Sequence, residues 1–150
     1  MKWNKTYFKW ILVLIWMVVI FSFSNDPAAV SDEKSGFVLK ILNALGIDLN
    51  SYFGELANFI VRKAGHFTEY FILYALLFNA LQDTSSLKQS LIISLVITFL
   101  YACSDEFHQI FIPGREGKFR DVLIDTSGGI FAGILMKIKS ATHVASGKLM

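Results

Sequence analysis

The sequence is poor in cysteine and proline, with one and two of them respectively among 150 residues. Because a lone cysteine has no partner in the chain, Cys103 excludes an intramolecular disulfide. Pro27 and Pro113 both lie outside the apolar runs, as expected where helices must satisfy every backbone hydrogen bond internally. A nucleophile elbow, a phosphate-cradling glycine loop and a zinc-protease helix are also lacking, so no well-known motif names a reaction.

Apolar residues, by contrast, are abundant. Hydrophobic residues make up 54% of the chain, aromatic residues 15%, and the mean hydropathy is +0.51, which is high for a soluble globular protein. No run is a clean stretch of the ~20 apolar residues that cross a bilayer. Four segments reach about that length when the polar residues at their ends are included: 7–24, 59–81, 90–107 and 121–138. We therefore predict one all-α domain over residues 1–150, a polytopic membrane bundle of four transmembrane helices. A soluble helical bundle is the alternative.

The distribution of charge predicts how these four spans are oriented. With a cytoplasmic N-terminus, the inner segments carry seven of the 14 cationic residues, and Asp83 is their one acid. The outer segments then carry the other seven cations and eleven acids. Because positive charge favours the cytoplasmic side, we expect both termini inside a multi-pass cell-membrane protein. The run Trp10–Phe23 has no small-x-small cleavage pattern before Pro27, so we expect it to stay as the first span rather than act as a cleaved signal.

The outer segment 31–58 is predicted to form two interfacial helices. Ser31 is a candidate N-cap, helically spaced apolar residues follow, and Gly46 is a natural helix end. A second apolar stripe begins after Asp48 and leads into the next span. These helices either lie in the headgroup plane or form a packed external cap.

Nearly all chemically active residues lie at the same end of the predicted spans. Glu69, Asp105 and Asp125 lie about 18–22 Å from the cytoplasmic ends of their helices, which places them roughly 8–12 Å below the outer edge of a ~30 Å core. Carboxyl groups at that depth should face one another or a wet cavity rather than lipid. The candidate catalytic residues are His66, Glu69, Asp105, Glu106, His108, Asp121 and Asp125.

Two spacings of three residues, His66–Glu69 and Asp105–His108, are expected to set an imidazole beside a carboxylate, for proton transfer or metal ligation. Spacing alone does not establish a metal site, and no cofactor is expected. The candidate substrate-binding residues are Arg62, Lys63, Gln109 and Arg115, the last aimed back by the Pro113–Gly114 turn. The alternative is a purely bracing network, with Arg62 or Arg120 on Asp121 and Arg115 on Glu69 or Asp105. Lys34, Lys40 and Lys118 are interpreted as solvated charges.

Two further patterns are interpreted as structural. Gly129 and Gly133 form a small-xxx-small step that allows close helix packing. An aromatic stripe on the second span is interpreted as a lipid or packing face, and it consists of Phe67, Phe71, Tyr74 and Phe78.

The order of these residues resembles the VanZ-like membrane proteins. The resemblance rests on Arg62-Lys63-x-x-His66-Phe67-x-Glu69-Tyr70, on Asp105-Glu106-Phe107-His108-Gln109-x-Phe111-x-Pro113-Gly114-Arg115, and on Asp121-Val122-x-Ile124-Asp125-Thr126-x-Gly128. It implies a small multi-span protein linked to lowered susceptibility to teicoplanin and related lipoglycopeptides, with no settled reaction. Glu116 and Lys118 depart from the small or hydroxyl residues that the family pattern implies after Arg115.

Three functions remain open at this point. The first is an outer-facing enzyme that modifies a lipid or a cell-envelope precursor. The second is a non-catalytic binder that shields a lipid-anchored antibiotic or its target. The third is a carrier, which the lack of ionisable groups in the inner halves of the spans argues against. The expected partners are membrane lipids, a lipid-linked cell-wall precursor or a lipoglycopeptide, and the net charge of +2 gives no reason to expect nucleic acid.

Overall fold

The computed structural model describes the backbone of residues 3–147 and the side chains of residues 5–142, and it is helical throughout its regular structure. The six helices of this part of the chain are α1 (Trp3–Ser24), α2 (Ala28–Ala44), α3 (Leu49–Phe53), α4 (Leu56–Leu81), α5 (Leu87–Gln109) and α6 (Phe119–Gly147). The predicted all-α class is confirmed.

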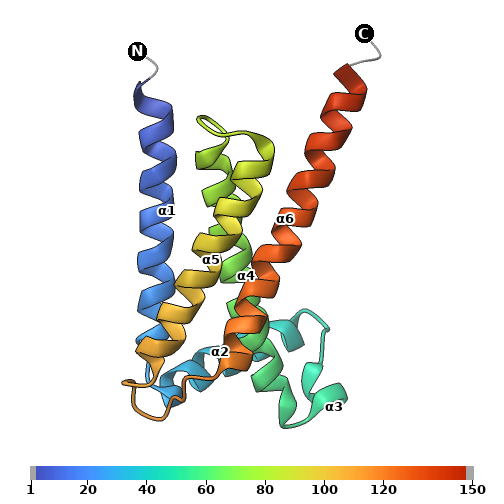
Figure 1. Cartoon of the computed structure of the whole chain (residues 1–150). Helices are drawn as coiled ribbons and strands as arrows, with labels where there is room; N and C mark the ends of the chain where they lie inside the picture. The colour runs from blue at the N-terminus through green and yellow to red at the C-terminus, as the bar shows by residue number, and fades with distance from the viewer. Residues whose placement is uncertain (1–2, 148–150) are drawn as a thin grey trace.

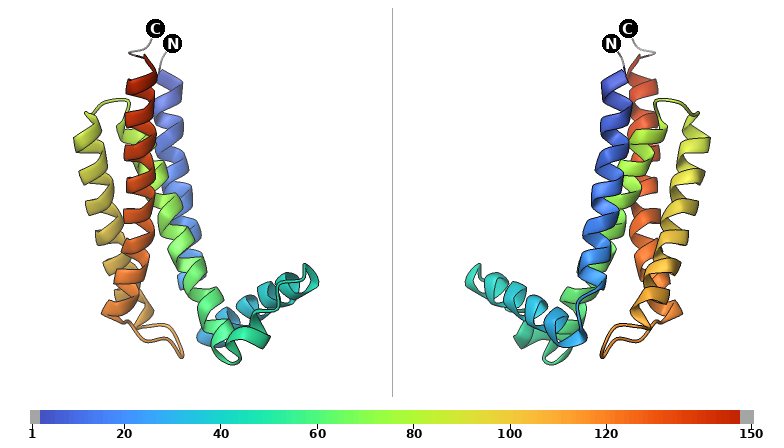
Figure 2. Two further views of the ribbon diagram at one scale, coloured as in Figure 1. Left: turned by 90° about the vertical axis from the view of Figure 1, so that its right-hand side faces the viewer. Right: turned by 90° about the vertical axis from the view of Figure 1, so that its left-hand side faces the viewer.

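Helix α4 is the centre of the bundle, because it contacts every other described helix. Helices α1, α5 and α6 run up and down beside it, and the two ends of the described chain lie at the same end of the bundle (Figure 1). Helices α2 and α3 and the connection between α5 and α6 lie at the opposite end, where α2 projects away from the bundle (Figure 2). The four long helices therefore alternate in direction, which the prediction of four spans requires, while their placement in a membrane stays a prediction.

The outer segment differs from its prediction at both helix boundaries. Helix α2 begins at Ala28 rather than after Ser31, because the carbonyl of Pro27 already accepts the Ser31 N–H at 3.0 Å. The predicted end holds, since Gly46 follows α2 with a φ of 86° that favours glycine. The second apolar stripe is not one helix: Gly54, with a φ of 53°, separates α3 from α4.

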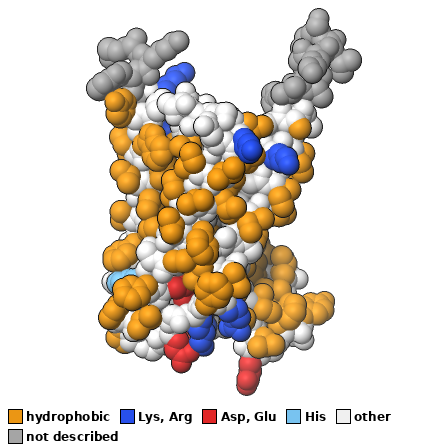
Figure 3. Space-filling model, in the orientation of Figure 1, with side chains coloured by type: hydrophobic (Ala, Val, Ile, Leu, Met, Phe, Trp, Pro, Cys, Tyr) orange, Lys and Arg blue, Asp and Glu red, His pale blue; other side chains and the backbone are white. Residues whose placement is uncertain are grey.

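The exterior of the bundle is apolar, and part of its interior is polar. Exposed large hydrophobic side chains run along α1, α5 and α6, and they cover the middle of the face in Figure 3. Ser90, Ser94 and Thr98 of α5 are fully buried instead. A water-soluble protein shows the reverse arrangement, so the exterior favours a lipid environment over the soluble-bundle alternative.

Two described segments, Lys5–Ser24 and Leu87–Gln109, are long and apolar enough to cross a membrane by length and composition alone. In the described part of the chain, helices α4 and α6 do not meet these criteria of length and apolar composition. Both carry polar and charged residues within the helix, such as Glu69 in α4 and Asp125 in α6. Four spans therefore stays a prediction.

Helix α6 packs closely through glycines, as predicted. A Cβ atom on Gly133 would lie 2.7 Å from the Tyr74 hydroxyl of α4, and one on Gly129 would lie 2.9 Å from Thr98 of α5. Neither position has room for a side chain. The aromatic stripe of α4 contributes to the same packing face, since Tyr74 and Phe78 are buried and Phe131 of α6 packs against its other two rings.

An ion pair at the end opposite the outer helices gives a pH prediction. Hydrogen bonds from Lys9 and then Thr6 lower the pKa of Asp83 below its ordinary value of 3.8. Because the folded-state pKa is depressed, this contribution to stability is present above pH 4 and is lost as the pH falls through the folded-state value. We expect Asp83→Asn to remove that part of the acid sensitivity of thermal unfolding. An unchanged profile would contradict the assignment.

Candidate functional site

Residues from three helices meet at the end of the bundle that carries α2. Ligating atoms of His66 (α4), Asp105 (α5) and Asp125 (α6) all lie within 4.8 Å of one another. The His66 Nδ1 is 3.6 Å from an Asp125 carboxylate oxygen. The approach of α6 to α4 is close here, because a Cβ atom on Gly128 would collide with the Phe67 backbone carbonyl. The structure therefore brings these three predicted residues together.

A buried hydrogen-bond network fixes Asp105 to the end of α1. The Ser24 hydroxyl donates to Asp105 Oδ2 at 2.6 Å, and the Gln109 side-chain amide donates to the same oxygen at 3.3 Å. All three side chains are buried. Gln109, predicted to bind substrate, thus positions a carboxylate. Ser24 is not among the predicted site residues, although the Ile20-Phe21-Ser22-x-Ser24 end of the first apolar run also fits the VanZ-like pattern.

The Pro113–Gly114 turn returns Arg115 to the site, as predicted, with a Gly114 φ of 75°. The guanidinium donates to the carbonyls of Asp26 at 2.7 Å and Phe23 at 3.1 Å, just beyond and within the end of α1. It also donates to Gln109 at 3.3 Å. Arg115 therefore ties the loop to α1 and pairs with neither carboxylate that the bracing alternative assigned to it.

Ion pairs account for only part of the acidic charge. Lys63 lies 2.7 Å from Asp121, Arg120 lies 3.7 Å from the same residue, and Arg62 pairs with Asp32 rather than Asp121. Bracing thus explains Asp121. The predicted site has four other acids, which are Glu69, Asp105, Glu106 and Asp125. Among the described side chains, no lysine or arginine forms an ion pair with any of them.

Asp125 is the least satisfied of these acids. Its side chain is 1% exposed, and neither of its oxygens accepts a hydrogen bond from the described residues. Within the same set, His66 Nδ1 and Glu106 Oε1 also lack hydrogen-bond partners, while Glu106 Oε2 accepts the Lys118 N–H at 2.9 Å. Buried polar groups are almost always bonded, and exceptions gather at functional sites.

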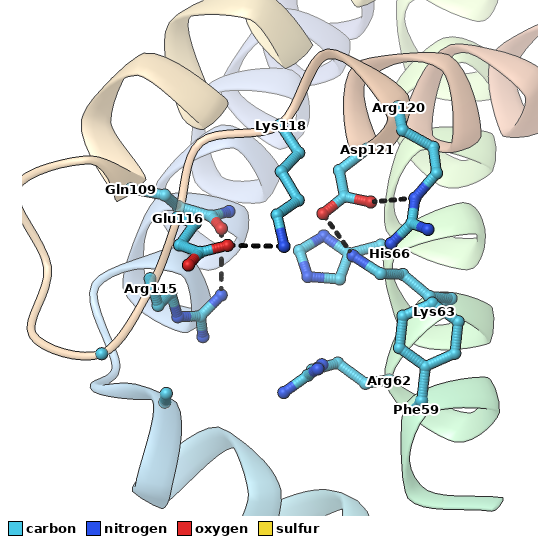
Figure 4. Close-up of a pocket in the computed structure, with 12 residues that line it drawn as sticks. Phe59, Arg62, Lys63, His66, Gln109, Arg115, Glu116, Lys118, Arg120 and Asp121 are labelled. Atoms are coloured by element: carbon cyan, nitrogen blue, oxygen red, sulfur yellow. Dashed lines mark hydrogen bonds and ion pairs between the residues drawn. The ribbon is translucent and has the colours of Figure 1, made fainter. Parts of the chain in front are cut away.

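Two pockets adjoin this cluster through His66, which lines both of them. The first, of about 140 Å³, is lined by five cationic side chains, by Glu116 and by Asp121 (Figure 4). Its cations are Arg62, Lys63, Arg115, Lys118 and Arg120. Lys118, interpreted from the sequence as a solvated charge, is therefore also part of a pocket wall.

The second pocket, of about 190 Å³, lies beside α2 and has a more apolar wall that includes Phe23 and Val38. Glu69 lines this pocket. Arg62, His66 and Arg115 line both pockets, so they stand between them.

The two arginines between the pockets, Arg62 and Arg115, point toward each other (Figure 4). Burial and the charge of Arg62 lower the pKa of Arg115 below its ordinary value. Two cations that face each other have the charge and the donors that suit an anion.

His108 is not brought into the cluster. Its ring lies 4.7 Å from that of Phe21, and its Nε2 is 3.3 Å from the Asn25 side-chain oxygen. Neither predicted pair of imidazole and carboxylate at a spacing of three residues forms a hydrogen bond in the described part of the chain. The partner of His66 comes instead from a different helix, which helical spacing along one segment cannot reveal.

A model of the VanZ/LLP1 family matches residues 8–140. The chain belongs to the VanZ/LLP1 family. The matched region of this VanZ/LLP1 protein includes all the residues of the cluster and of both pockets. Neither the curated proteins nor the solved structures contain a significant match. VanZ/LLP1 membership suggests a membrane protein linked to glycopeptide resistance.

Proposed function

We propose that this VanZ/LLP1 protein crosses the membrane four times with both termini in the cytoplasm. Its polar site lies toward the outer leaflet, where it binds the anionic headgroup of a lipid or lipid-linked cell-envelope component and acts on it. The protein thereby lowers susceptibility to glycopeptides of the teicoplanin type. The apolar exterior, the excess of cations at the end that carries both termini, and the family membership support this proposal.

One observation carries it: a pocket walled by five cations adjoins the buried cluster of His66, Asp105 and Asp125 through His66, which lines the pocket. The cationic wall suits a phosphate or carboxylate headgroup. His66 has one ring nitrogen free of hydrogen bonds to the described residues and a carboxylate 3.6 Å away. That arrangement suits proton transfer to or from a bound group. Pure bracing requires neither feature.

The outer helices support an approach from the leaflet. Phe37 and Ile41 of α2 expose their side chains, as do Leu45 directly after α2 and Tyr52 and Phe53 of α3. Apolar side chains on a short outer helix are typical of segments that lie at the membrane interface. The second pocket lies beside α2 and has an apolar wall, so an acyl chain would fit there while the headgroup meets Arg62 and Arg115.

The test compares lipids and cell-wall precursors in cells with the intact protein, with His66→Ala, with Asp105→Asn and without the protein. A modified lipid or precursor that appears only with the intact residues supports the proposed action. Resistance without a new product supports binding alone. If the purified protein retains no anionic lipid and the cells show neither a product nor resistance, the proposal is wrong.

Arg62→Gln is expected to weaken the binding of an anionic lipid to the purified protein in nanodiscs by roughly 10-fold or more, because charge-assisted hydrogen bonds contribute about 1.5–3 kcal/mol. Lys40→Gln is the matched control, since Lys40 is exposed on α2 and lines neither pocket. Equal losses in the two variants would indicate general attraction between a cationic surface and the lipid.

A further inference from the structure

We propose that His66, Asp105 and Asp125 bind a divalent transition-metal cation, with Zn²⁺ and Mn²⁺ as the ions that suit one imidazole nitrogen and two carboxylates. The inference deepens the proposed function, because the cation would lie beside the pocket that His66 lines. It can nevertheless be tested without any lipid.

The geometry is the first support. Each of the three residues offers a ligand atom, and these atoms lie within 4.8 Å of one another. Ligands that share one metal ion at about 2.0–2.2 Å from it lie roughly 3–4 Å apart. A small rotation of the side chains would bring the three atoms to that separation. The three helices hold their backbones in place around the cluster.

Unsatisfied bonding capacity is an independent support. Asp125 is 1% exposed, and both of its oxygens lack hydrogen-bond partners among the described residues. It faces His66 Nδ1, which is equally without such a partner. A fully buried carboxylate directed at an imidazole and lacking donors has the bonding capacity that a metal ion would use. The second shell is also in place, because Ser24 and Gln109 hold Asp105.

The charges of the three residues are also consistent with a bound divalent cation. Two carboxylates and a neutral imidazole carry two negative charges, which a divalent cation would neutralise. The nearby side-chain cations bind elsewhere, since Lys63 pairs with Asp121, and Arg115 donates to backbone carbonyls and to Gln109. Two ionised carboxylates without a counter-ion would be strongly unfavourable in this buried place, so a bound cation or a bound proton must neutralise them.

The site also has an access route and an open side. His66 lines both pockets, so a cation bound to it would face the space above the cluster. Three protein ligands leave a coordination position for water or for an oxygen of an anionic headgroup. The five cationic side chains of the first pocket would hold such a headgroup from the other side.

The test uses the full chain purified in detergent and stripped of metal with EDTA. We expect calorimetric titration with Zn²⁺ or Mn²⁺ to give one ion per chain, and Asp125→Asn to weaken binding by roughly 100-fold or more. His108→Ala is the matched control, because His108 lies near the same end of the bundle but outside the cluster, and it should bind as the unaltered protein does. No binding of either ion, or equal losses in both variants, would overturn the proposal.

Thermal unfolding separates a metal ligand from a bracing residue. For a ligand, the stripped Asp125→Asn protein should be at least as stable as the stripped unaltered protein, and Zn²⁺ or Mn²⁺ should raise the Tm of the latter only. If Asp125 merely braces His66, the stripped variant should unfold at a lower temperature, and neither metal should matter. His66→Gln gives the same comparison if Asp125→Asn does not fold. Metal binding without lipid binding would overturn only the proposed function, and the reverse only the metal site.

Discussion

Cells that carry the His66→Ala protein are expected to be as sensitive to teicoplanin as cells without the protein. His66 stands between the two pockets and contacts Asp125, so its removal takes away the one imidazole in the cluster. If the site is catalytic, losing a positioned acid or base lowers the rate by roughly 10²–10⁴-fold. The measurements are the minimal inhibitory concentration and the amount of protein in the membrane fraction, which should not change.

His108→Ala serves as the comparison for this result. Both histidines lie in the half of the bundle that carries α2, but His108 packs on Phe21 and contacts Asn25 outside the cluster. Cells with the His108→Ala protein should therefore keep the same minimal inhibitory concentration as cells with the unaltered protein. If His66→Ala retains full resistance, or if both variants lose it to the same extent, the site does not reside in this cluster.

The second large effect is expected from Gly128→Ala, which should destabilise the bundle by about 3 kcal/mol. The added Cβ would meet the carbonyl oxygen of Phe67 and lie 3.2 Å from the backbone nitrogen of Phe71. Since backbone atoms cannot rotate aside as a flexible side chain can, α6 must move away from α4. We expect a lower Tm in detergent and less folded protein in membranes.

Gly65→Ala is the paired substitution, at a glycine of α4 that lies outside this helix contact. A Cβ atom at Gly65 of α4 would have nothing within 4 Å. Because alanine favours a helix over glycine, this change should stabilise the protein by up to about 1 kcal/mol. A Gly128→Ala protein as stable as the Gly65→Ala protein would show that the α4–α6 contact is looser than the structure indicates.

The sequence predicts much of this fold because helical periodicity and burial in lipid impose strong patterns. The four long helices contain the predicted segments, with ends that extend by up to four residues in α1, α4 and α5 and by nine at the end of α6. The close approach at Gly129 and Gly133 also follows from spacing alone. The meeting of Asp105 and Asp125 was predicted for a physical reason, since acids at equal depth in neighbouring helices avoid lipid.

Partners across helices could not be predicted in the same way. Spacing along a helix suggested that Glu69 would accompany His66, whereas the rotation of α6 about its axis supplies Asp125 instead. The bonding of Arg115 to the end of α1 was missed for a related reason. Its acceptors there are backbone carbonyls, which every residue has, so no sequence pattern identifies them. Such contacts depend on how the helices are turned relative to one another.

The central place of α4 has a consequence for the making of the protein. Its neighbours α1, α2 and α3 precede it in the chain, so a first half can assemble while the ribosome is still translating. Asp125 belongs to the last helix to emerge. A nascent chain halted before α6 would therefore contain His66 and Asp105 but lack the buried carboxylate of Asp125 that completes the cluster.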